Sequence, residues 1–77
     1  NYFLKRKLPA NKVSMAAKIF NEGNKMFNQG RFEEAVLYYE KALAIDSTYI
    51  RAHNNMGISF IQLKKYDEAL RHFHAIT

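Results

Sequence analysis

The sequence predicts an all-α protein made of antiparallel helical hairpins, and three observations lead to that prediction. The same residue types recur 34 residues apart, and the apolar residues within each copy follow the 3.6-residue period of helices. The two-residue alternation typical of strands does not persist in any part of the sequence. With 77 residues and no cysteine, the chain has room for one domain, which no disulfide stabilises.

The repeat is seen when the sequence is aligned with itself at an offset of 34 residues. Four aligned pairs are identical: Asn21 and Asn55, Gly23 and Gly57, Glu34 and Glu68, and Ala35 and Ala69. Five more pairs are chemically alike: Arg31 and Lys65, Phe32 and Tyr66, Glu33 and Asp67, Val36 and Leu70, and Tyr39 and Phe73. Because these pairs cluster in the same order, an internal repeat explains them better than chance does.

The first repeat is predicted at residues 14–49, with Ser14 as the N-cap of its first helix. The core stripe of that helix contains Ile19, Gly23 and Met26. Residues 28–30 end it, because the glycine there readily takes the left-handed conformation found at helix ends. The core stripe of the second helix contains Phe32, Ala35, Val36, Tyr39, Ala42 and Leu43, and residues 46–48 are predicted as the turn between repeats.

The second repeat is predicted at residues 50–77, truncated near its end, with Thr48 as its N-cap. Its two helices carry the stripes His53, Met56, Gly57 and Phe60, and then Tyr66, Ala69, Leu70, Phe73 and Ile76. Lys64 occupies the place that Gly30 has in the first repeat, so we expect this turn to be slightly strained or differently capped.

Gly23 and Gly57 are predicted to lie in the middle of helices, where glycine costs about 1 kcal/mol relative to alanine. Such a cost is tolerated where two helix backbones approach closely. We expect Ala35 and Ala69 to face these glycines, and a large aromatic side chain to fill the space one turn further along.

These residues resemble the tetratricopeptide repeat, whose 34-residue signature is a bulky residue, Leu-Gly, an aromatic residue, and then Ala, an aromatic residue and Pro. The resemblance covers residues 16–49 fully and residues 50–77 to near the end of the second hairpin. The first copy departs from the signature at Glu22, where an apolar residue is usual, and at Ser47, where proline is usual. The resemblance implies hairpins stacked as a right-handed superhelix, whose concave side is lined by the first helix of each pair.

The concave side is also where the resemblance implies a bound peptide. On the first helix of each repeat, a second stripe lies beside the core stripe. Its residues are Ala17, Phe20, Asn21, Asn24, Phe27 and Asn28 in the first repeat, and Arg51, Asn54, Asn55, Ile58, Ile61 and Gln62 in the second. All of these except Ala17 and Ile61 are candidate peptide-binding residues. An asparagine amide offers both a donor and an acceptor to a peptide backbone.

Two more specific hypotheses follow from the same resemblance. Asn21 and Asn55, one repeat apart, resemble the asparagine ladder of the superhelix in the O-linked N-acetylglucosamine transferase; the alternative is solvated asparagine in a chain that holds seven. Asn24 and Asn55 also match two asparagines of the carboxylate clamp that holds chaperone tails. Phe20 replaces the clamp lysine, however, and the other clamp cations would lie in a third repeat, so the clamp is not favoured.

Metal, cofactor and catalytic roles are not predicted. His72 and His74 are two residues apart and point to different sides of a helix, so we expect them on a solvated face, with His53 as a structural residue. The acidic pairs Glu33–Glu34 and Asp67–Glu68 each follow a turn, where the helix dipole favours them. Without a nucleophile beside a base or a phosphate loop, the sequence does not predict an enzyme.

The net charge of +5 lies entirely in residues 1–18, because residues 19–77 hold seven basic and seven acidic side chains. The electrically balanced repeats argue against nucleic-acid binding, and no apolar run is long enough to span a membrane. Residues 1–13 are interpreted as a basic leader or as the end of a preceding helix. As a leader, they would carry a nuclear import signal or a patch for an acidic partner.

The predicted function is a non-catalytic protein-interaction scaffold that binds an extended peptide, inside the cell, in the cytoplasm or nucleus. The alternative is an assembly element with an empty groove. Two repeats leave a stack uncovered at its end, so we expect either further repeats of the same chain or self-association. The residues expected at this assembly end are Leu70, Phe73 and Ile76.

Overall fold

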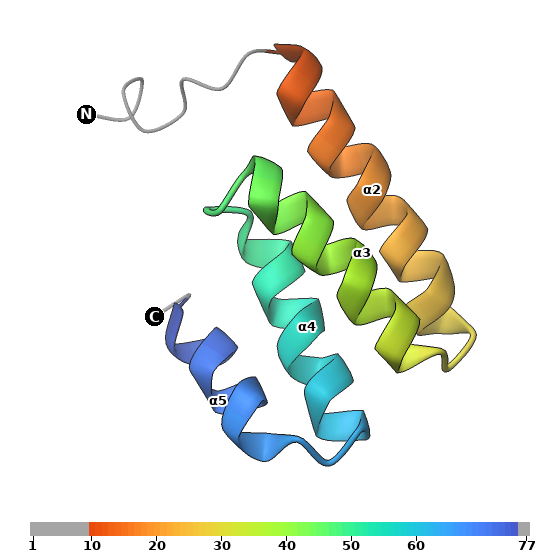
Figure 1. Cartoon of the computed structure of the whole chain (residues 1–77), viewed down its shortest axis with the longest axis vertical. Helices are drawn as coiled ribbons and strands as arrows, with labels where there is room; N and C mark the ends of the chain where they lie inside the picture. The colour runs from red at the N-terminus through yellow and green to blue at the C-terminus, as the bar shows by residue number, and fades with distance from the viewer. Residues whose placement is uncertain (1–9, 76–77) are drawn as a thin grey trace.

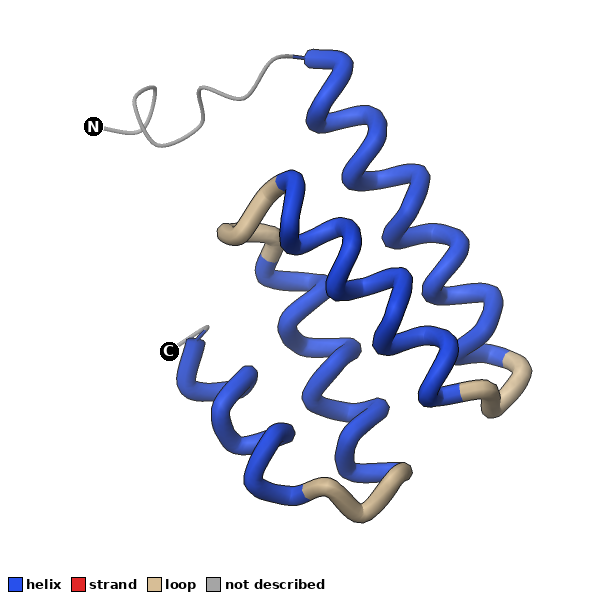
Figure 2. Tube along the Cα trace, in the orientation of Figure 1, coloured by secondary structure: helices blue, strands red, loops and turns tan. Residues whose placement is uncertain are grey.

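The computed structural model describes residues 10–75, and in that range it contains four helices and no strand. In chain order they are α2 (Ala10–Asn28), α3 (Phe32–Ile45), α4 (Ile50–Gln62) and α5 (Tyr66–Ala75). The helices lie side by side and alternate in direction, so α2 and α4 run the same way and α3 and α5 run back (Figures 1 and 2). Each helix packs against the next one along the chain. The all-α prediction of two stacked hairpins is confirmed.

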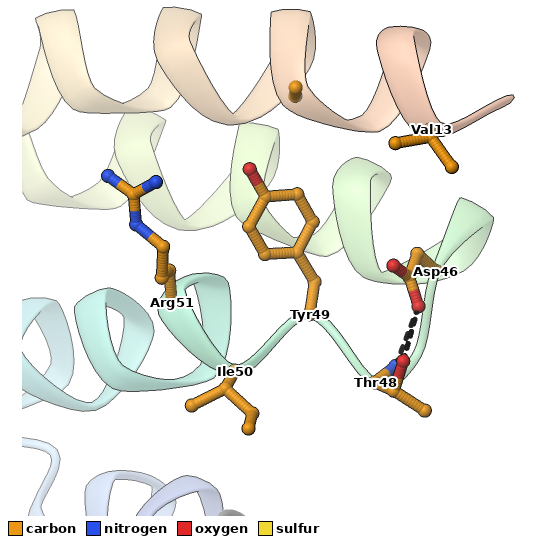
Figure 3. Close-up of a pocket in the computed structure, with 7 residues that line it drawn as sticks. Val13, Asp46, Thr48, Tyr49, Ile50 and Arg51 are labelled. Atoms are coloured by element: carbon orange, nitrogen blue, oxygen red, sulfur yellow. Dashed lines mark hydrogen bonds between the residues drawn. The ribbon is translucent and has the colours of Figure 1, made fainter. Parts of the chain in front are cut away.

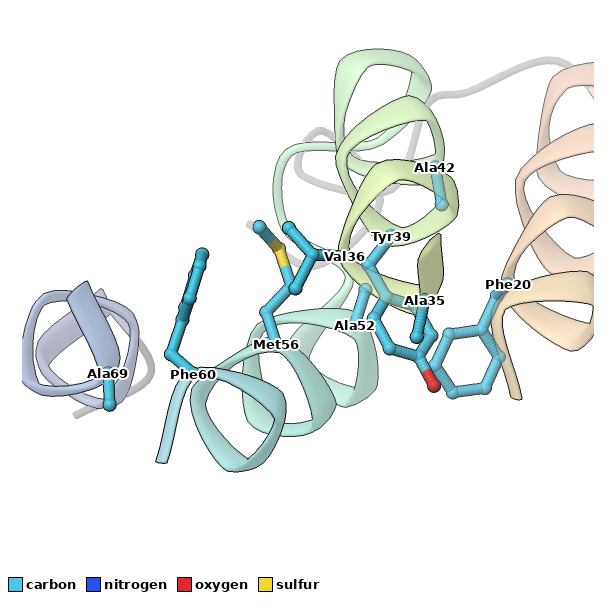
Figure 4. Packing of buried hydrophobic residues seen from close by; sticks show 9 residues of the cluster. All are labelled: Phe20, Ala35, Val36, Tyr39, Ala42, Ala52, Met56, Phe60 and Ala69. Atoms are coloured by element: carbon cyan, nitrogen blue, oxygen red, sulfur yellow. The ribbon is translucent and has the colours of Figure 1, made fainter. Parts of the chain in front are cut away.

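The core lies on both sides of α3, because the side chains of that helix reach toward α2 and toward α4. The largest fully buried side chains of the core are Tyr39, Phe20, Met56 and Ser59. Figure 4 shows the Tyr39 ring beside Phe20 on α2, while Val36 and Met56 fill the space between α3 and α4. Phe60 continues the core toward Ala69 on α5. One apolar cluster therefore joins all four helices.

The two helix glycines mark the closest approaches within the hairpins. A Cβ atom added at Gly23 would lie 2.7 Å from a ring carbon of Tyr39 and 3.1 Å from Cβ of Tyr38. A Cβ atom added at Gly57 would lie 2.6 Å from the ring of Phe73. Each aromatic ring occupies the space that a side chain on the facing helix would need. The predicted close approach is present in both hairpins, but the side chain that faces the glycine is the aromatic ring of Tyr39 or Phe73 rather than the expected Ala35 or Ala69.

The turns within the two hairpins have the same backbone path but different residues. Gly30 has φ +77° and Lys64 has φ +63°, so both take the left-handed conformation. The next residue donates back into the helix in both turns, from the Arg31 amide to Met26 O (2.9 Å) and from the Lys65 amide to Phe60 O (2.7 Å). These bonds close a helix end whose geometry favours glycine. The predicted strain in the second turn is confirmed, because lysine occupies the glycine conformation.

We therefore expect Lys64→Gly to stabilise the protein by about 0.5–1 kcal/mol, since glycine adopts a positive φ without steric cost. Urea unfolding followed by circular dichroism measures the change. The matched variant is Gly30→Ala, which should destabilise the protein by a similar amount through backbone conformation alone, because no atom lies within 4 Å of the added Cβ. Equal midpoints for Lys64→Gly and the unaltered chain would contradict the assignment of strain to this turn.

Two predicted helix caps are wrong. Ser14 lies inside α2, which already includes Ala10. The N-cap of α4 is Tyr49, which makes no side-chain capping bond. Thr48 instead belongs to the turn before it, where the Asp46 carboxylate accepts bonds from its amide (3.1 Å) and its hydroxyl (2.7 Å). The predicted turn at residues 46–48 is confirmed, and its own hydrogen bonds replace the expected cap.

Candidate functional site

One face of α2 and the matching face of α4 together form the candidate site. We define this inner surface by the residues that share the helical stripes: Ala17, Asn21, Asn24 and Asn28 on α2, and Arg51, Asn54, Asn55, Ile58 and Gln62 on α4. Two contacts place the stripes side by side. Ala17 and Arg51 line the same pocket, and the side chains of Asn24 and Asn55 are hydrogen-bonded to each other.

A three-residue polar network lies at the centre of the inner surface. Asn24 Oδ1 accepts a bond from the Tyr39 hydroxyl at 2.5 Å and another from Asn55 Nδ2 at 2.9 Å. Asn55 Nδ2 also approaches the Tyr39 oxygen at 3.4 Å. Because Tyr39 is fully buried on α3, the network attaches α2 and α4 to the helix behind them. It orients both amides at the surface.

Burial of Tyr39 has a consequence at high pH. Burial raises the pKa of its hydroxyl above the ordinary value near 10, and the hydrogen bond from Asn55 opposes part of that shift. The unfolded chain therefore loses this proton first. Below about pH 10, the Tyr39 hydroxyl is protonated in both states, so it should not change the free energy of unfolding. That free energy should fall as the pH rises from there through the pKa of Tyr39 in the folded protein. The readout is the urea midpoint measured from pH 8 to pH 11.5.

The control is Tyr39→Phe, which keeps the ring and removes the ionisable group. At neutral pH it should lose about 1 kcal/mol with the hydrogen bond to Asn24. Above pH 10 its stability should fall less steeply than that of the unaltered chain. Parallel pH profiles for the two proteins would show that ionisation of Tyr39 does not drive the loss.

A pocket of about 340 Å³ opens at one end of the inner surface. Its walls are Val13 and Ala17 of α2 and the segment that leads into α4: Asp46, Thr48, Tyr49, Ile50 and Arg51. In Figure 3 the Tyr49 ring and the Arg51 side chain extend toward α2, and Ile50 points away from it. The Arg51 guanidinium lies 5.1 Å from the centre of the Phe20 ring. The pocket thus combines an exposed cation with an apolar wall.

Two aromatic candidates for the peptide-binding face lie mainly in the packing of the hairpin. Phe20 is only 1% exposed, stacked on Tyr49 with ring centres 5.0 Å apart. Its placement on the binding face is corrected: it is a core residue beneath Arg51. Phe27 is half-buried and meets Phe32 edge-on across the first turn. Neither aromatic ring is part of the inner surface as defined.

The other candidate residues differ in their exposure. Asn21, Asn28, Arg51, Asn54 and Gln62 are exposed. Asn24, Asn55 and Ile58 are half-buried. The structure therefore brings Asn24 and Asn55 together, whereas Asn21 stays outside the network. Both asparagines were predicted for this face, but the bond between them was not.

A second pocket, of about 470 Å³, lies on the opposite side between α3 and α5 and was not predicted. Its lining is Glu33, Val36, Leu37, Glu40, Phe60, Leu63, Lys65 and Glu68. One sequence feature could have indicated this pocket: the acidic pairs that follow each turn, from which Glu33 and Glu68 line it. At the level of the sequence, the helix dipole alone explains those acids.

His72 also differs from its prediction as a solvated residue. Its Nδ1 atom lies 3.1 Å from Nδ1 of His53, and its ring stacks on Phe60. Burial lowers the pKa of His72, and so do His53 and Arg71, while Glu40 opposes the shift. His53 is half-buried within the hairpin, as expected of a structural residue. The two rings form a direct contact between α4 and α5.

Two kinds of feature are absent from residues 10–75. No three side chains of the metal-binding types come together there. Nor is any helix in that range long and apolar enough to cross a membrane.

Comparison with known proteins identifies the repeat. A family model described as TPR repeat matches residues 23–64, more than half of the chain. The chain is 46% identical over 54 residues to protein O-mannosyl-transferase Tmtc3 of Drosophila melanogaster, covering 69% of this chain and 6% of that protein.

Two further relatives have similar short matches. Identity is 44% over 50 residues to the peroxisomal targeting signal receptor of Candida albicans, and 37% over 49 residues to the Hsp70-Hsp90 organising protein of Plasmodium falciparum. These matches cover 65% and 64% of this chain, but only 8% and 9% of the relatives. The chain therefore spans less than a tenth of the length of each of these three proteins.

Proposed function

Because the chain belongs to the tetratricopeptide repeat family, we propose that it binds an extended peptide segment of a partner protein along its inner surface. Repeats of this family are in general non-catalytic modules for protein–protein interaction. The observation that carries the more specific proposal is the bonded pair Asn24–Asn55 at the centre of this surface. A binding rather than a catalytic role, at an intracellular location, is part of the proposal.

The chemistry of the pair suits a peptide backbone. The Asn24 oxygen and the Asn55 nitrogen are used in the bond between them, which leaves the Asn24 nitrogen as a donor and the Asn55 oxygen as an acceptor. A peptide group in an extended strand presents one donor and one acceptor. The pair can therefore bind backbone without requiring a particular peptide sequence. Tyr39 holds it in place, which lowers the entropy lost on binding.

The pocket beside Arg51 adds a place for one side chain of the same peptide. Val13 and Ala17 offer apolar wall, and Arg51 offers a cation at the rim. Arg51 favours an acidic group and the apolar wall favours a short aliphatic one, while the buried Asp46 carboxylate of the same pocket is bonded to Thr48. Two relatives carry names that denote protein recognition, a peroxisomal targeting signal receptor and an Hsp70-Hsp90 organising protein. Both names agree with a peptide-binding role.

The test selects ligands from a random library of 12-residue peptides and measures their affinity by calorimetry. Asn55→Ala removes a surface acceptor and should weaken binding about 5–10-fold, the value of one or two hydrogen bonds. Asn21→Ala lies beside the network without belonging to it, and should weaken binding while leaving stability unchanged. The matched control, Leu37→Ala on the opposite pocket, should bind normally. Equal affinity for all variants, or no selected peptide, contradicts the proposal.

The open face of α5 favours a second candidate function, in assembly. Tyr66 and Leu70, one turn apart on the same face of α5, are 60% and 58% exposed and together leave an apolar patch open. Phe73 is half-buried against Gly57, so it belongs partly to the hairpin, and Ile76 lies outside the described residues. A neighbouring repeat or a second copy would cover Leu70. Light scattering gives the solution mass: a dimer dissociated by Leu70→Asp supports assembly, and a monomer at high concentration contradicts self-association.

A further inference from the structure

In the contact between His53 and His72, a hydrogen bond to the backbone fixes which ring nitrogen of His53 carries the proton. His53 Nε2 lies 3.1 Å from the carbonyl oxygen of Ser47. A carbonyl can only accept, so Nε2 carries the proton of neutral His53 and Nδ1 carries a lone pair. That lone pair faces His72 Nδ1 at 3.1 Å. The backbone thus holds His53 in the tautomer that a metal ion bound at Nδ1 requires.

From this geometry we propose that His53 and His72 form a two-histidine site for a divalent transition-metal ion, bound through both Nδ1 atoms. Such ions favour imidazole nitrogen. A ligating histidine usually donates its other ring N–H to a carbonyl or carboxylate, and the Ser47 carbonyl already accepts that bond from His53. In the metal-free protein, His72 Nδ1–H donates to His53. On binding, the proton of His72 moves to its Nε2 through solvent.

The spacing fits a shared ion without rearranging the helices. Zinc–nitrogen bonds are about 2.0–2.1 Å long, so nitrogens 3.1 Å apart subtend about 98° at the ion. A tetrahedral ion needs them about 3.3–3.4 Å apart, with both lone pairs turned toward a point beside the line that joins the two atoms. The rings must therefore separate by about 0.3 Å and also rotate. Both rings are half-buried, so water can reach the ion and complete its coordination. The Glu40 carboxylate favours a cation there, and Arg71 opposes one.

A metal ion bound at this site would crosslink the two helices of the second hairpin. His53 belongs to α4 and His72 to α5, so an ion bound to both joins the two helices of that repeat. Sequence spacing could not reveal it, because the ligands are 19 residues apart on different helices. In the sequence His72 lies two residues from His74, but the histidine that its Nδ1 atom meets is His53.

Thermal unfolding in zinc chloride tests the proposal, with magnesium chloride as the ion that prefers oxygen ligands. With zinc about tenfold above its dissociation constant, the midpoint should rise by roughly 5–10 °C. Magnesium should leave it unchanged. His53→Gln and His72→Gln should each abolish the rise, and the matched control His74→Gln should retain it. No rise in the unaltered chain, or an equal rise in all variants, overturns the site.

Nitrogen-15 spectra of the unaltered chain keep the test decisive if a variant fails to fold. On zinc addition, the Nδ1 signals of His53 and His72 should shift together, and Nε2 of His53 should stay protonated. A shift confined to Nε2 atoms, or to His74, would place the ion elsewhere.

Discussion

Phe20→Ala is expected to destabilise the protein by about 3–5 kcal/mol, the range for removing a fully buried phenylalanine. A domain of this length has a total stability of about 4–12 kcal/mol, so the loss removes between about a quarter and all of it. The reason is local. The ring is 1% exposed and packs between Tyr39 and Tyr49, with centres 5.5 and 5.0 Å away. Urea unfolding measures the loss.

The neighbouring residue provides the control. Asn21 is exposed, so Asn21→Ala should change stability by less than about 0.5 kcal/mol. The two variants therefore separate the core from the inner surface at adjacent positions. If Phe20→Ala were as stable as Asn21→Ala, the ring would belong to the exposed face that the sequence first indicated.

Gly23→Val is expected to be the second most damaging change, with a loss of about 3 kcal/mol, at the upper end for overpacking. Its Cβ would lie 2.7 Å from the ring of Tyr39, which is fully buried and hydrogen-bonded to Asn24. Cβ of Tyr38, 3.1 Å away, is close to the α3 backbone and cannot move aside. Helix propensity alone predicts the opposite sign, because valine is a better helix former than glycine.

Gly57→Val is the matched comparison, since it occupies the same position in the second repeat. The ring it meets belongs to Phe73, which is half-buried on the last described helix and can shift at lower cost. We expect a smaller loss there, and denaturant midpoints for both variants provide the comparison. A gain in stability for Gly23→Val would contradict the close approach of α2 and α3.

These cases show what the sequence could predict about the fold. The glycine and the aromatic residue recur at the repeat interval, so a close approach of the two helices followed from periodicity, although alanine was expected to face the glycine and the aromatic ring does so instead. Lys64 was predictable for the same reason, because a lysine at a glycine position in a repeated turn must adopt the same φ. Because the repeat occurs twice, each structural position shows two residue choices, and their agreement indicates what the position requires. A single hairpin gives no such comparison.

Phe20 shows where periodicity fails. It lies at the border between the core stripe and the inner surface of α2, and the helical period alone does not decide which way a border residue faces. Tyr49, from the turn between repeats, packs over the ring and buries it. Residues in the turn have no helical period from which their packing could be read.

The polar pairs that cross between helices could not be predicted. Asn24 meets Asn55, and His53 meets His72, because of the rotation of one helix against another. That rotation depends on the packed volumes of side chains such as Tyr39. The residue types on the inner surface could therefore be anticipated, whereas their partners could not.

Amide chemical-shift mapping tests the inner surface most directly as the peptide-binding face. The chain, labelled with nitrogen-15, is titrated with a peptide selected from the 12-residue library. The largest shifts should fall on α2 and α4, at Asn21, Asn24, Asn55 and Ile58, and extend to Arg51 at the pocket. Shifts concentrated at Leu37 on α3 or Leu70 on α5 would contradict that assignment and place binding on the opposite side or at the open end.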